Sequence, residues 1–211
     1  MDELVDIRDA ETGERTGEVV WKSEAHRSGI WHRCIHCWIF GVDAGTGEPY
    51  LLVQRRAATK DTWPGYLDLT VGGHLGAGEE PLDGLREVEE ELGLRVEPER
   101  LVPLGTRRAE QEIPEGLDRE FQDVFLVRDD TPPGDLRLQK EEVEAVLRIG
   151  LDDAEALGAA GSAPAQGYRD GEVSEVRVRD ADFVPNTDEY LRRVAVEARA
   201  ALDGGRLEKI F

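Results

Sequence analysis

Three glutamates at helical spacing are the first side chains in this sequence that could do chemistry. Glu87, Glu90 and Glu91 fall within an arc of about 100° if the segment forms an α-helix, because residues three and four apart share a face. Like charges at this spacing weaken a helix by about 0.3 kcal/mol per pair. A hard divalent cation, which prefers oxygen ligands, would offset that repulsion. The pattern therefore indicates a candidate cation site.

The residues before these glutamates help to distinguish a cation site from an ordinary acidic surface. On an acidic surface, Arg86 could pair with Glu90 one turn later and no ion would be needed. The preceding loop favours the cation site, because Gly72 and Gly73 let backbone carbonyls approach a ligand closely. Glu79 adds a further carboxylate at the entrance of the helix.

The glutamates lie on the most clearly predicted helix of the chain. It is expected from Pro81 to Leu92, because proline suits the first turn of a helix and Gly93 is placed to end it. The apolar face, which we expect in the core, consists of Leu82, Leu85, Val88 and Leu92.

Strands dominate the rest of the predicted structure. Strands are expected at residues 5–8, 17–21, 32–40, 50–54, 67–71, 101–106, 123–127, 143–149 and 173–178. Helices are expected at residues 152–157 and 188–202, and residues 159–166 are expected to form a loop. This order predicts an α+β fold, an α/β/α sandwich with a mixed β-sheet. We expect one domain over residues 1–211, with a core at about 5–157 and a C-terminal extension at 158–211 that ends in a helix.

Composition excludes several classes of partner. The 211 residues include 46 acidic and 26 basic side chains, a net charge of −20 that repels nucleic acid and anionic membranes. The sequence shows neither a membrane-spanning apolar run nor a signal peptide, so a cytoplasmic location is expected. A small anionic substrate is compatible with this charge if a metal ion or a local basic patch reverses the field at the site.

The two cysteines are expected to be reduced and structural. Cys34 and Cys37 have the spacing of a redox pair or of half a zinc site. They lie in a predicted strand, where a period of two sends them to opposite faces. A second pair of cysteines, which a four-cysteine zinc site needs, is absent from the sequence.

The acidic helix and its loop resemble the signature of the Nudix hydrolase family, G-x5-E-x7-R-E-U-x-E-E-x-G-U with U aliphatic. The segment between Glu79 and Arg86 is one residue shorter than in the family, which leaves the orientation of Glu79 open. The matching residues are Gly73, Glu79, Arg86, Glu87, Val88, Glu90, Glu91, Gly93 and Leu94.

The resemblance implies that Mg²⁺ or Mn²⁺ promotes the attack of water on a diphosphate linkage. Glu87, Glu90, Glu91 and the carbonyl of Gly73 would then bind the metal, and Arg86 would belong to the catalytic group. The general base would be Glu87 or one of two later carboxylates, and the sequence does not choose among them. Those later carboxylates are Glu141 and Glu142.

The flanking residues are similar to the branch of this superfamily that includes type I isopentenyl-diphosphate isomerase. In that pattern Arg56 and Lys60 would hold a diphosphate, and Trp63 or Tyr66 could stack on a base or pack against a prenyl chain. Isomerases of this type bind a metal through histidines, so further metal ligands are possible. The matching or nearly matching positions are His26, His32 and His74.

Two departures favour hydrolysis over isomerisation. Gly72 stands where the isomerases have a catalytic cysteine. In the later strand motif, Asp123 matches the catalytic glutamate and Phe121 matches a metal-binding glutamate. The isomerases have also largely lost the glutamates of the helix, which this chain retains.

We therefore expect a hydrolase that cleaves a nucleoside diphosphate derivative or another small organic diphosphate, with a homodimer compatible with the family. An isomerase acting on isopentenyl diphosphate is the alternative. A degenerate, non-catalytic module that binds a nucleotide or a protein is the third hypothesis, and the shortened spacing after Glu79 is its support.

Overall fold

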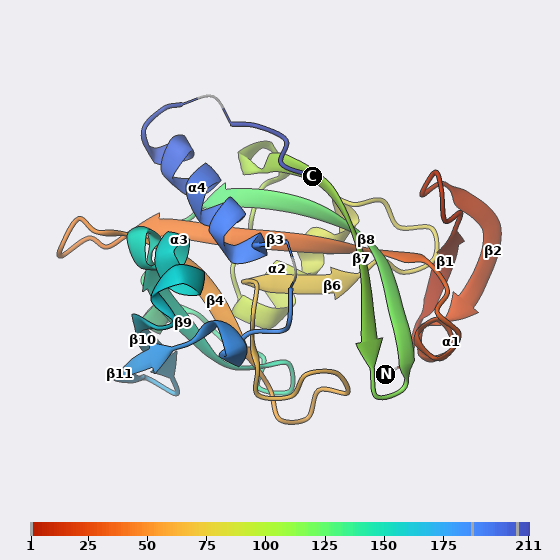
Figure 1. The fold of residues 1–211 in the computed structure, drawn as a ribbon, viewed down its shortest axis with the longest axis horizontal. Coiled ribbons are helices and arrows are strands. Elements are labelled where there is room, and N and C mark those ends of the chain that lie inside the picture. The colour runs from red at the N-terminus through yellow and green to blue at the C-terminus, as the bar shows by residue number, and fades with distance from the viewer. Residues whose placement is uncertain (1, 187, 206) are drawn as a thin grey trace.

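The computed structural model describes residues 2–186, 188–205 and 207–211. Runs of consecutive strands are separated by single α-helices along the chain (Figure 1). The strands are β1 (Leu4–Arg8), β2 (Arg15–Trp21), β3 (His32–Val42), β4 (Pro49–Arg56), β5 (Leu67–Asp68), β6 (Val71–His74), β7 (Val102–Ile113), β8 (Gly116–Arg128), β9 (Val143–Gly150), β10 (Ala163–Arg169) and β11 (Glu172–Val178). The α-helices are α1 (Lys22–Ser28), α2 (Arg86–Leu92), α3 (Leu151–Ala160) and α4 (Tyr190–Leu202).

A mixed sheet of nine strands forms the centre of the molecule. Its main order is β11-β10-β9-β4-β3-β8-β7, with β5 paired to β4 and β6 paired to β3. The pairing of β3 with β8 is parallel, and the other pairings in this sheet are antiparallel. The register of β3 and β8 places His32 opposite Glu120 and Cys34 opposite Gln122.

Helices cover both faces of this sheet, as an α/β/α sandwich requires (Figure 1). On one face, α3 and α4 pack over a large apolar cluster that includes Leu51, Ile149 and Val194. On the other face, α2 buries Val88 and Leu92 against a smaller cluster. The predicted fold class is therefore confirmed.

The N-terminal hairpin supports the loop that precedes α2. Strands β1 and β2 form their own two-stranded sheet. Val5 makes an isolated bridge to Gly76, and the amide of Ala77 donates to the carbonyl of Leu4. Helix α1 follows this hairpin and contacts β8, which brings His26 to the central sheet.

The structure differs from the predicted elements at several points. Residues 163–169 form β10 rather than a loop, because their alternately buried side chains fit between β9 and β11. The predicted strand at 67–71 is split into β5 and β6, and the hydroxyl of Thr70 bonds to the backbone of Ile39 and Leu52. Helix α1 was not predicted. The predicted helix at 81–92 is α-helical only from Arg86, after a 3-10 turn at Asp83–Leu85.

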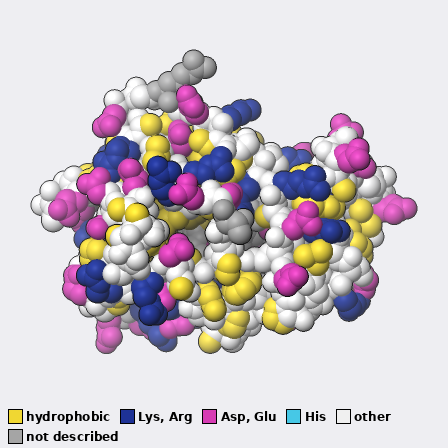
Figure 2. Space-filling view, viewed as in Figure 1, with side chains coloured by type: hydrophobic (Ala, Val, Ile, Leu, Met, Phe, Trp, Pro, Cys, Tyr) yellow, Lys and Arg dark blue, Asp and Glu magenta, His cyan; other side chains and the backbone are white. Residues whose placement is uncertain are grey.

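The surface is less uniformly acidic than the net charge suggests. Figure 2 shows basic side chains interspersed with acidic ones across the visible face. Ion pairs account for much of this arrangement, as between Arg199 and Glu155 (Nε–Oε1 2.7 Å). Among the residues that the structure describes, none forms a helix long and apolar enough to cross a membrane.

Candidate active site

The shortened loop still brings Glu79 to Arg86. The Nε and Nη2 atoms of Arg86 each donate to a carboxylate oxygen of Glu79 at 3.0 Å, and the Gly76 amide donates to Glu79 Oε2 at 2.7 Å. The 3-10 turn before α2 rises about 2.0 Å per residue instead of about 1.5 Å, which helps fewer residues to span the distance. The predicted pairing of Arg86 with Glu90 is wrong, because Arg86 pairs with Glu79 and Glu87 instead.

Glu87 lies directly against the backbone of Gly73. A Cβ atom placed on Gly73 would lie 2.3 Å from Glu87 Cγ, so only glycine allows this approach. Partial burial raises the pKa of Glu87 above its usual range, and the guanidinium of Arg86 opposes that rise.

Glu91 and Glu90 occupy opposite environments on α2. The side chain of Glu91 is buried with the residue only 3% exposed, and it accepts a hydrogen bond from Gln54 Nε2 at 3.3 Å. Burial raises the pKa of Glu91 to about 8, although the positive charge of Lys60 opposes this. Glu90 is exposed.

The helix therefore buries its predicted apolar residues Val88 and Leu92, and it also buries one of the glutamates. Glu91 is buried beside Val88 and Leu92, whereas Leu82, expected in the core, is 47% exposed. Across residues 2–186, 188–205 and 207–211, the three glutamates of α2 do not form a group with all ligand atoms within 4.8 Å. The structure thus places Glu87 against Gly73 and Glu91 toward β4, whereas Glu90 is exposed on the surface.

The predicted basic pair lies at the end of β4 and in the loop that follows. Arg56 Nη1 donates to Asp68 Oδ2 at 3.0 Å, and its Nε donates to the carbonyl of Thr62 at 3.1 Å. Lys60 forms an ion pair with Glu142. Both cations are therefore held by neighbouring carboxylates.

The predicted aromatic pair lies in the same loop. Trp63 and Tyr66 contact each other edge to face, with ring centroids 5.2 Å apart. Trp63 lines the cleft described below. Its backbone is left-handed (φ 51°), a strained conformation for a bulky residue.

A compact cluster of histidines and carboxylates lies on the other side of Gly73. His26 Nε2 is 3.3 Å from His74 Nε2 and 3.7 Å from Asp118 Oδ1. His32 Nε2 is 3.6 Å from Asp118 Oδ1 and 3.8 Å from Glu120 Oε1, and His74 Nε2 is 3.4 Å from the same Glu120 oxygen. Ligands at about 2.1 Å from one ion are separated by roughly these distances.

The chemistry of this cluster fits a metal ion. His32 Nε2 and Asp118 Oδ1 are buried without a hydrogen-bond partner, which is costly unless a ligand satisfies them. Burial lowers the pKa of His26 to about 3 and of His32 to about 4, so both rings are neutral and can offer a lone pair. Burial and the charge of Glu120 raise the pKa of Asp118 to about 8.

Asp123 and Phe121, which the sequence matched to the later strand motif, make contacts other than those the motif implies. The carboxylate of Asp123 accepts two hydrogen bonds from the Arg33 guanidinium (2.5 and 2.7 Å) and forms an ion pair with it. The ring of Phe121 packs against Trp31. Asp118 and Glu120 face the histidines instead. The signal for them is the acid-x-acid spacing on one strand, whose period of two places both side chains on one face.

One cleft of about 1120 Å³ is lined both by the predicted basic pair, Arg56 and Lys60, and by the predicted histidines His26 and His74. It is lined at one end by Arg56, Lys60 and Glu142, and elsewhere by Gly73 and His74. The other lining residues used below are His26, Cys34, His36, Trp63, Arg107, Asp118, Glu120, Gln122, Asp188 and Tyr190. Within the part of the chain that the structure describes, Glu87, Glu90 and Glu91 do not belong to this lining.

The cysteines lie on opposite faces of β3, as predicted. Cys34 lines the cleft and Cys37 belongs to the apolar cluster under α2. Both are free thiols, and burial raises the pKa of Cys37 to about 12.

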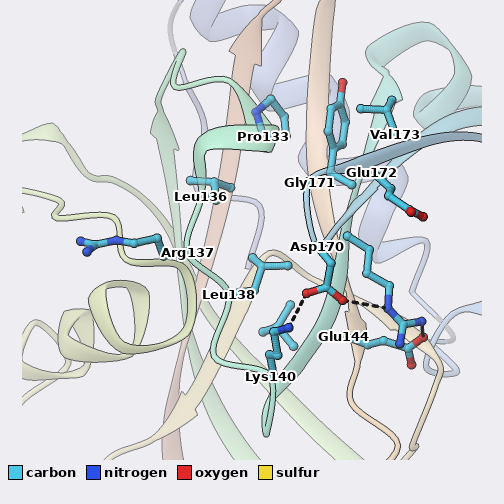
Figure 3. A pocket seen from close by; sticks show the side chains of 14 residues that line it. Pro133, Leu136, Arg137, Leu138, Lys140, Glu144, Asp170, Gly171, Glu172 and Val173 are labelled. Atoms are coloured by element: carbon cyan, nitrogen blue, oxygen red, sulfur yellow. Dashed lines mark hydrogen bonds and ion pairs between the residues drawn. The ribbon is translucent and has the colours of Figure 1, made fainter.

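A second, smaller cavity of about 320 Å³ lies between the 133–140 loop and the β10–β11 hairpin (Figure 3). Two ion pairs lie in its lining, Lys140 with Asp170 and Arg169 with Glu144. None of the predicted site residues lines it.

Comparisons with known proteins agree with this fold. Residues 32–170 match the NUDIX domain family. An uncharacterized Nudix hydrolase of Clostridium acetobutylicum is 31% identical over 210 residues, which is 96% of this chain and 98% of that protein. Isopentenyl-diphosphate Delta-isomerase 1 of Photorhabdus laumondii is 31% identical over 156 residues, 72% of this chain and 80% of that one.

A solved structure supports the fold alone. The crystal structure of DR0079 from Deinococcus radiodurans superposes with a TM-score of 0.56 at 23% identity, covering 76% of this chain and 91% of that one. The chain belongs to the Nudix family, and its relatives include both Nudix hydrolases and isopentenyl-diphosphate isomerases.

Proposed function

We propose that this protein is a metal-dependent hydrolase that cleaves the diphosphate linkage of a small organic diphosphate. The observation that carries the proposal is the cleft that joins the cations Arg56 and Lys60 to Gly73 and to the histidine–carboxylate cluster. On a chain with a net charge of −20, this is where an anion can be bound and neutralised.

Two groups of residues would hold divalent cations. Glu87, Glu90, Glu91 and the Gly73 carbonyl offer oxygen ligands, which suit Mg²⁺ or Mn²⁺. The cluster of His26, His32, His74, Asp118 and Glu120 mixes nitrogen and oxygen, which suits Mn²⁺ or a softer ion. A bound cation would supply charge neutralisation for the diphosphate.

The remaining site residues would bind the diphosphate and move a proton. Arg56 and Lys60 would hold phosphate oxygens, with Lys60 exchanging Glu142 for the substrate. That exchange would free Glu142, which lines the cleft, to accept a proton from the attacking water. Glu87 beside Gly73 is the other candidate base, and Arg86 would orient it. Glu141 is exposed, and its carbonyl accepts a hydrogen bond from Thr59.

The proposal is tested by cleavage of the diphosphate linkage in a panel of compounds, with the two phosphate-containing products separated and quantified by chromatography. The panel contains nucleoside diphosphates, nucleotide sugars, dinucleoside polyphosphates and prenyl diphosphates, each with Mg²⁺ or Mn²⁺ and with excess chelator. We expect metal-dependent cleavage of at least one compound, and we expect Glu91→Gln and Glu90→Gln each to abolish it. Glu89→Gln, an exposed change on the same helix, is the matched control and should keep full activity.

Isomerisation of isopentenyl diphosphate is the second candidate, and the histidine–carboxylate cluster favours it. Against it, Gly72 carries no acid–base group, and the nearest thiol in the lining is the buried Cys34 on β3. Incubation with isopentenyl diphosphate and metal separates the two activities. Release of phosphate or diphosphate indicates a hydrolase, whereas formation of dimethylallyl diphosphate indicates an isomerase.

A further inference from the structure

One wall of the cleft is built by residues from outside the matched NUDIX region. The family match ends at residue 170, yet Asp188 and Tyr190 line the same cleft as Gly73 and His74. Tyr190 is the first residue of α4 and is 4% exposed. The C-terminal extension therefore takes part in forming the site.

Asp188 and Tyr190 hold Arg107 of β7 in one position. Arg107 Nε and Nη2 donate to the two Asp188 oxygens at 2.7 and 2.8 Å, and Nη1 donates to Gln122 Oε1 at 2.6 Å. The guanidinium carbon also lies 4.6 Å from the centroid of the Tyr190 ring. The Arg107 side chain is only 11% exposed, so this buried fork is rigid and charged.

The same tyrosine positions His36 of β3. The Tyr190 hydroxyl and His36 Nδ1 are 2.9 Å apart, and the two rings stack with centroids 5.9 Å apart. Phe211 packs edge-on against Tyr190 with centroids 5.3 Å apart, and its amide donates to the Leu104 carbonyl at 3.1 Å. Tyr190 is thus fixed from both sides.

We propose that the C-terminal extension determines which substrates the cleft accepts. Asp188 and Tyr190 position Arg107 and His36, and these four residues form what we call the specificity wall. The wall selects diphosphates whose organic group forms hydrogen bonds, such as a sugar or nucleoside, over those with a hydrocarbon chain. This inference rests on the proposed function and narrows its substrate. Arg107 and His36 face the organic group, and Asp188 acts through Arg107 as a positioning residue.

The preference follows from the cost of desolvation. A hydrocarbon chain laid against Arg107 and His36 would strip water from these largely buried polar side chains and return no hydrogen bonds. A site built to hydrogen-bond its substrate rejects analogues that lack the polar group by about 10⁴-fold. Because part of this wall is already paired internally, we expect a smaller preference of at least about 100-fold in kcat/KM.

The test compares three probes on the metal-loaded, full-length protein. Methyl diphosphate reports the diphosphate end alone, UDP-glucose adds a polar group, and isopentenyl diphosphate adds a hydrocarbon. We expect wild type to prefer UDP-glucose to isopentenyl diphosphate by at least about 100-fold in kcat/KM.

Variants of the wall residues distinguish a role in positioning the substrate-binding groups from a role in the stability of the fold. Arg107→Met, Asp188→Asn and Tyr190→Phe should each raise the ratio of the KM for UDP-glucose to the KM for methyl diphosphate at least about tenfold. Arg95→Met, whose side chain is 78% exposed in wild type, is the control and should change neither. A purely structural role would instead lower activity on both probes together with the melting temperature.

Two results would overturn the inference. The first is equal kcat/KM for UDP-glucose and isopentenyl diphosphate in wild type, and the second is variants that weaken all probes equally. If none of the probes is hydrolysed, the proposed function fails, and calorimetric binding of the same probes then tests the wall. Tighter binding of UDP-glucose than of isopentenyl diphosphate, lost in Arg107→Met, supports it, whereas equal binding overturns it.

Discussion

At the scale of single residues, the same side chain acquires different chemistry from its surroundings. Glu90 and Glu91 are neighbours in the family signature, yet Glu90 is exposed and Glu91 is buried beside Gln54. Asp118 and Asp123 are both on β8, yet Asp118 has an unpartnered buried oxygen and Asp123 is neutralised by Arg33. Whether a carboxylate is free to bind a metal ion therefore depends on its contacts in the fold, and residue type alone does not determine it.

The histidine–carboxylate cluster predicts a loss of metal on a single substitution. His32→Gln removes a buried nitrogen that has no partner in the protein, so we expect bound Mn²⁺ to fall by about one ion per chain. Equilibrium dialysis with elemental analysis measures this. Glu110→Gln, at an exposed position of β7, should leave the metal content unchanged. Unaltered metal content in His32→Gln would contradict the assignment of this cluster.

The raised pKa of Asp118 predicts that metal affinity increases with pH. Because its pKa is about 8, a cation binding at pH 6 must displace a proton, and affinity should rise about tenfold per pH unit up to about pH 8. His26 and His32, with pKa values lowered to about 3 and 4, are neutral throughout this range and add no dependence. Titration calorimetry with Mn²⁺ at pH 6, 7 and 8 checks this, and an affinity that falls with pH would refute it.

The same group makes the metal-free protein less stable as pH rises. Between about pH 6.5 and 8, above the ordinary pKa of histidine, the folded chain keeps a proton on Asp118 that the unfolded chain has lost, so this group makes the free energy of unfolding decrease with increasing pH. Bound metal removes this penalty, because it stabilises the ionised carboxylate.

At the scale of elements, the contact between β6 and α2 sets the position of Glu87. Gly73→Ala would place a methyl group 2.3 Å from Glu87 Cγ, so the helix must shift. We expect a loss of about 1–3 kcal/mol in the free energy of unfolding and at least a tenfold loss in kcat. Chemical denaturation and phosphate release measure the two effects.

A second glycine provides the control for that substitution. Gly158 lies inside α3, and a Cβ atom there would meet nothing within 4 Å. Gly158→Ala should therefore stabilise the protein by about 0.5–1 kcal/mol and leave kcat unchanged. If Gly73→Ala behaved like Gly158→Ala, the close approach of Glu87 would have no functional role.

The sequence predicted elements best where one periodicity dominates. The strand containing Cys34 and Cys37 was predicted with its two faces, because side chains of any strand point alternately to opposite sides of the sheet. The burial of Glu91 was not predicted, because an acidic residue is expected at the surface and only its packing against β4 reveals its position. Strand β10 was missed because its small residues gain strand geometry from pairing with β9 and β11.

At the scale of the whole molecule, the site draws on segments that are far apart in the chain. His26 comes from α1, Glu120 from β8 and Tyr190 from the start of α4, and they meet in one cleft. The family resemblance identified the box residues and the histidines from local motifs. It could not identify Asp118, Glu120 or Tyr190, because their roles depend on which strands and helices the fold places side by side.

Phosphate release from a small organic diphosphate, with and without divalent metal, tests the central claim most directly. We predict that Mg²⁺ or Mn²⁺ supports release, that excess chelator stops it, and that Glu91→Gln reduces kcat at least a hundredfold while Glu89→Gln does not. Release that continues at full rate in chelator and in Glu91→Gln would contradict the account.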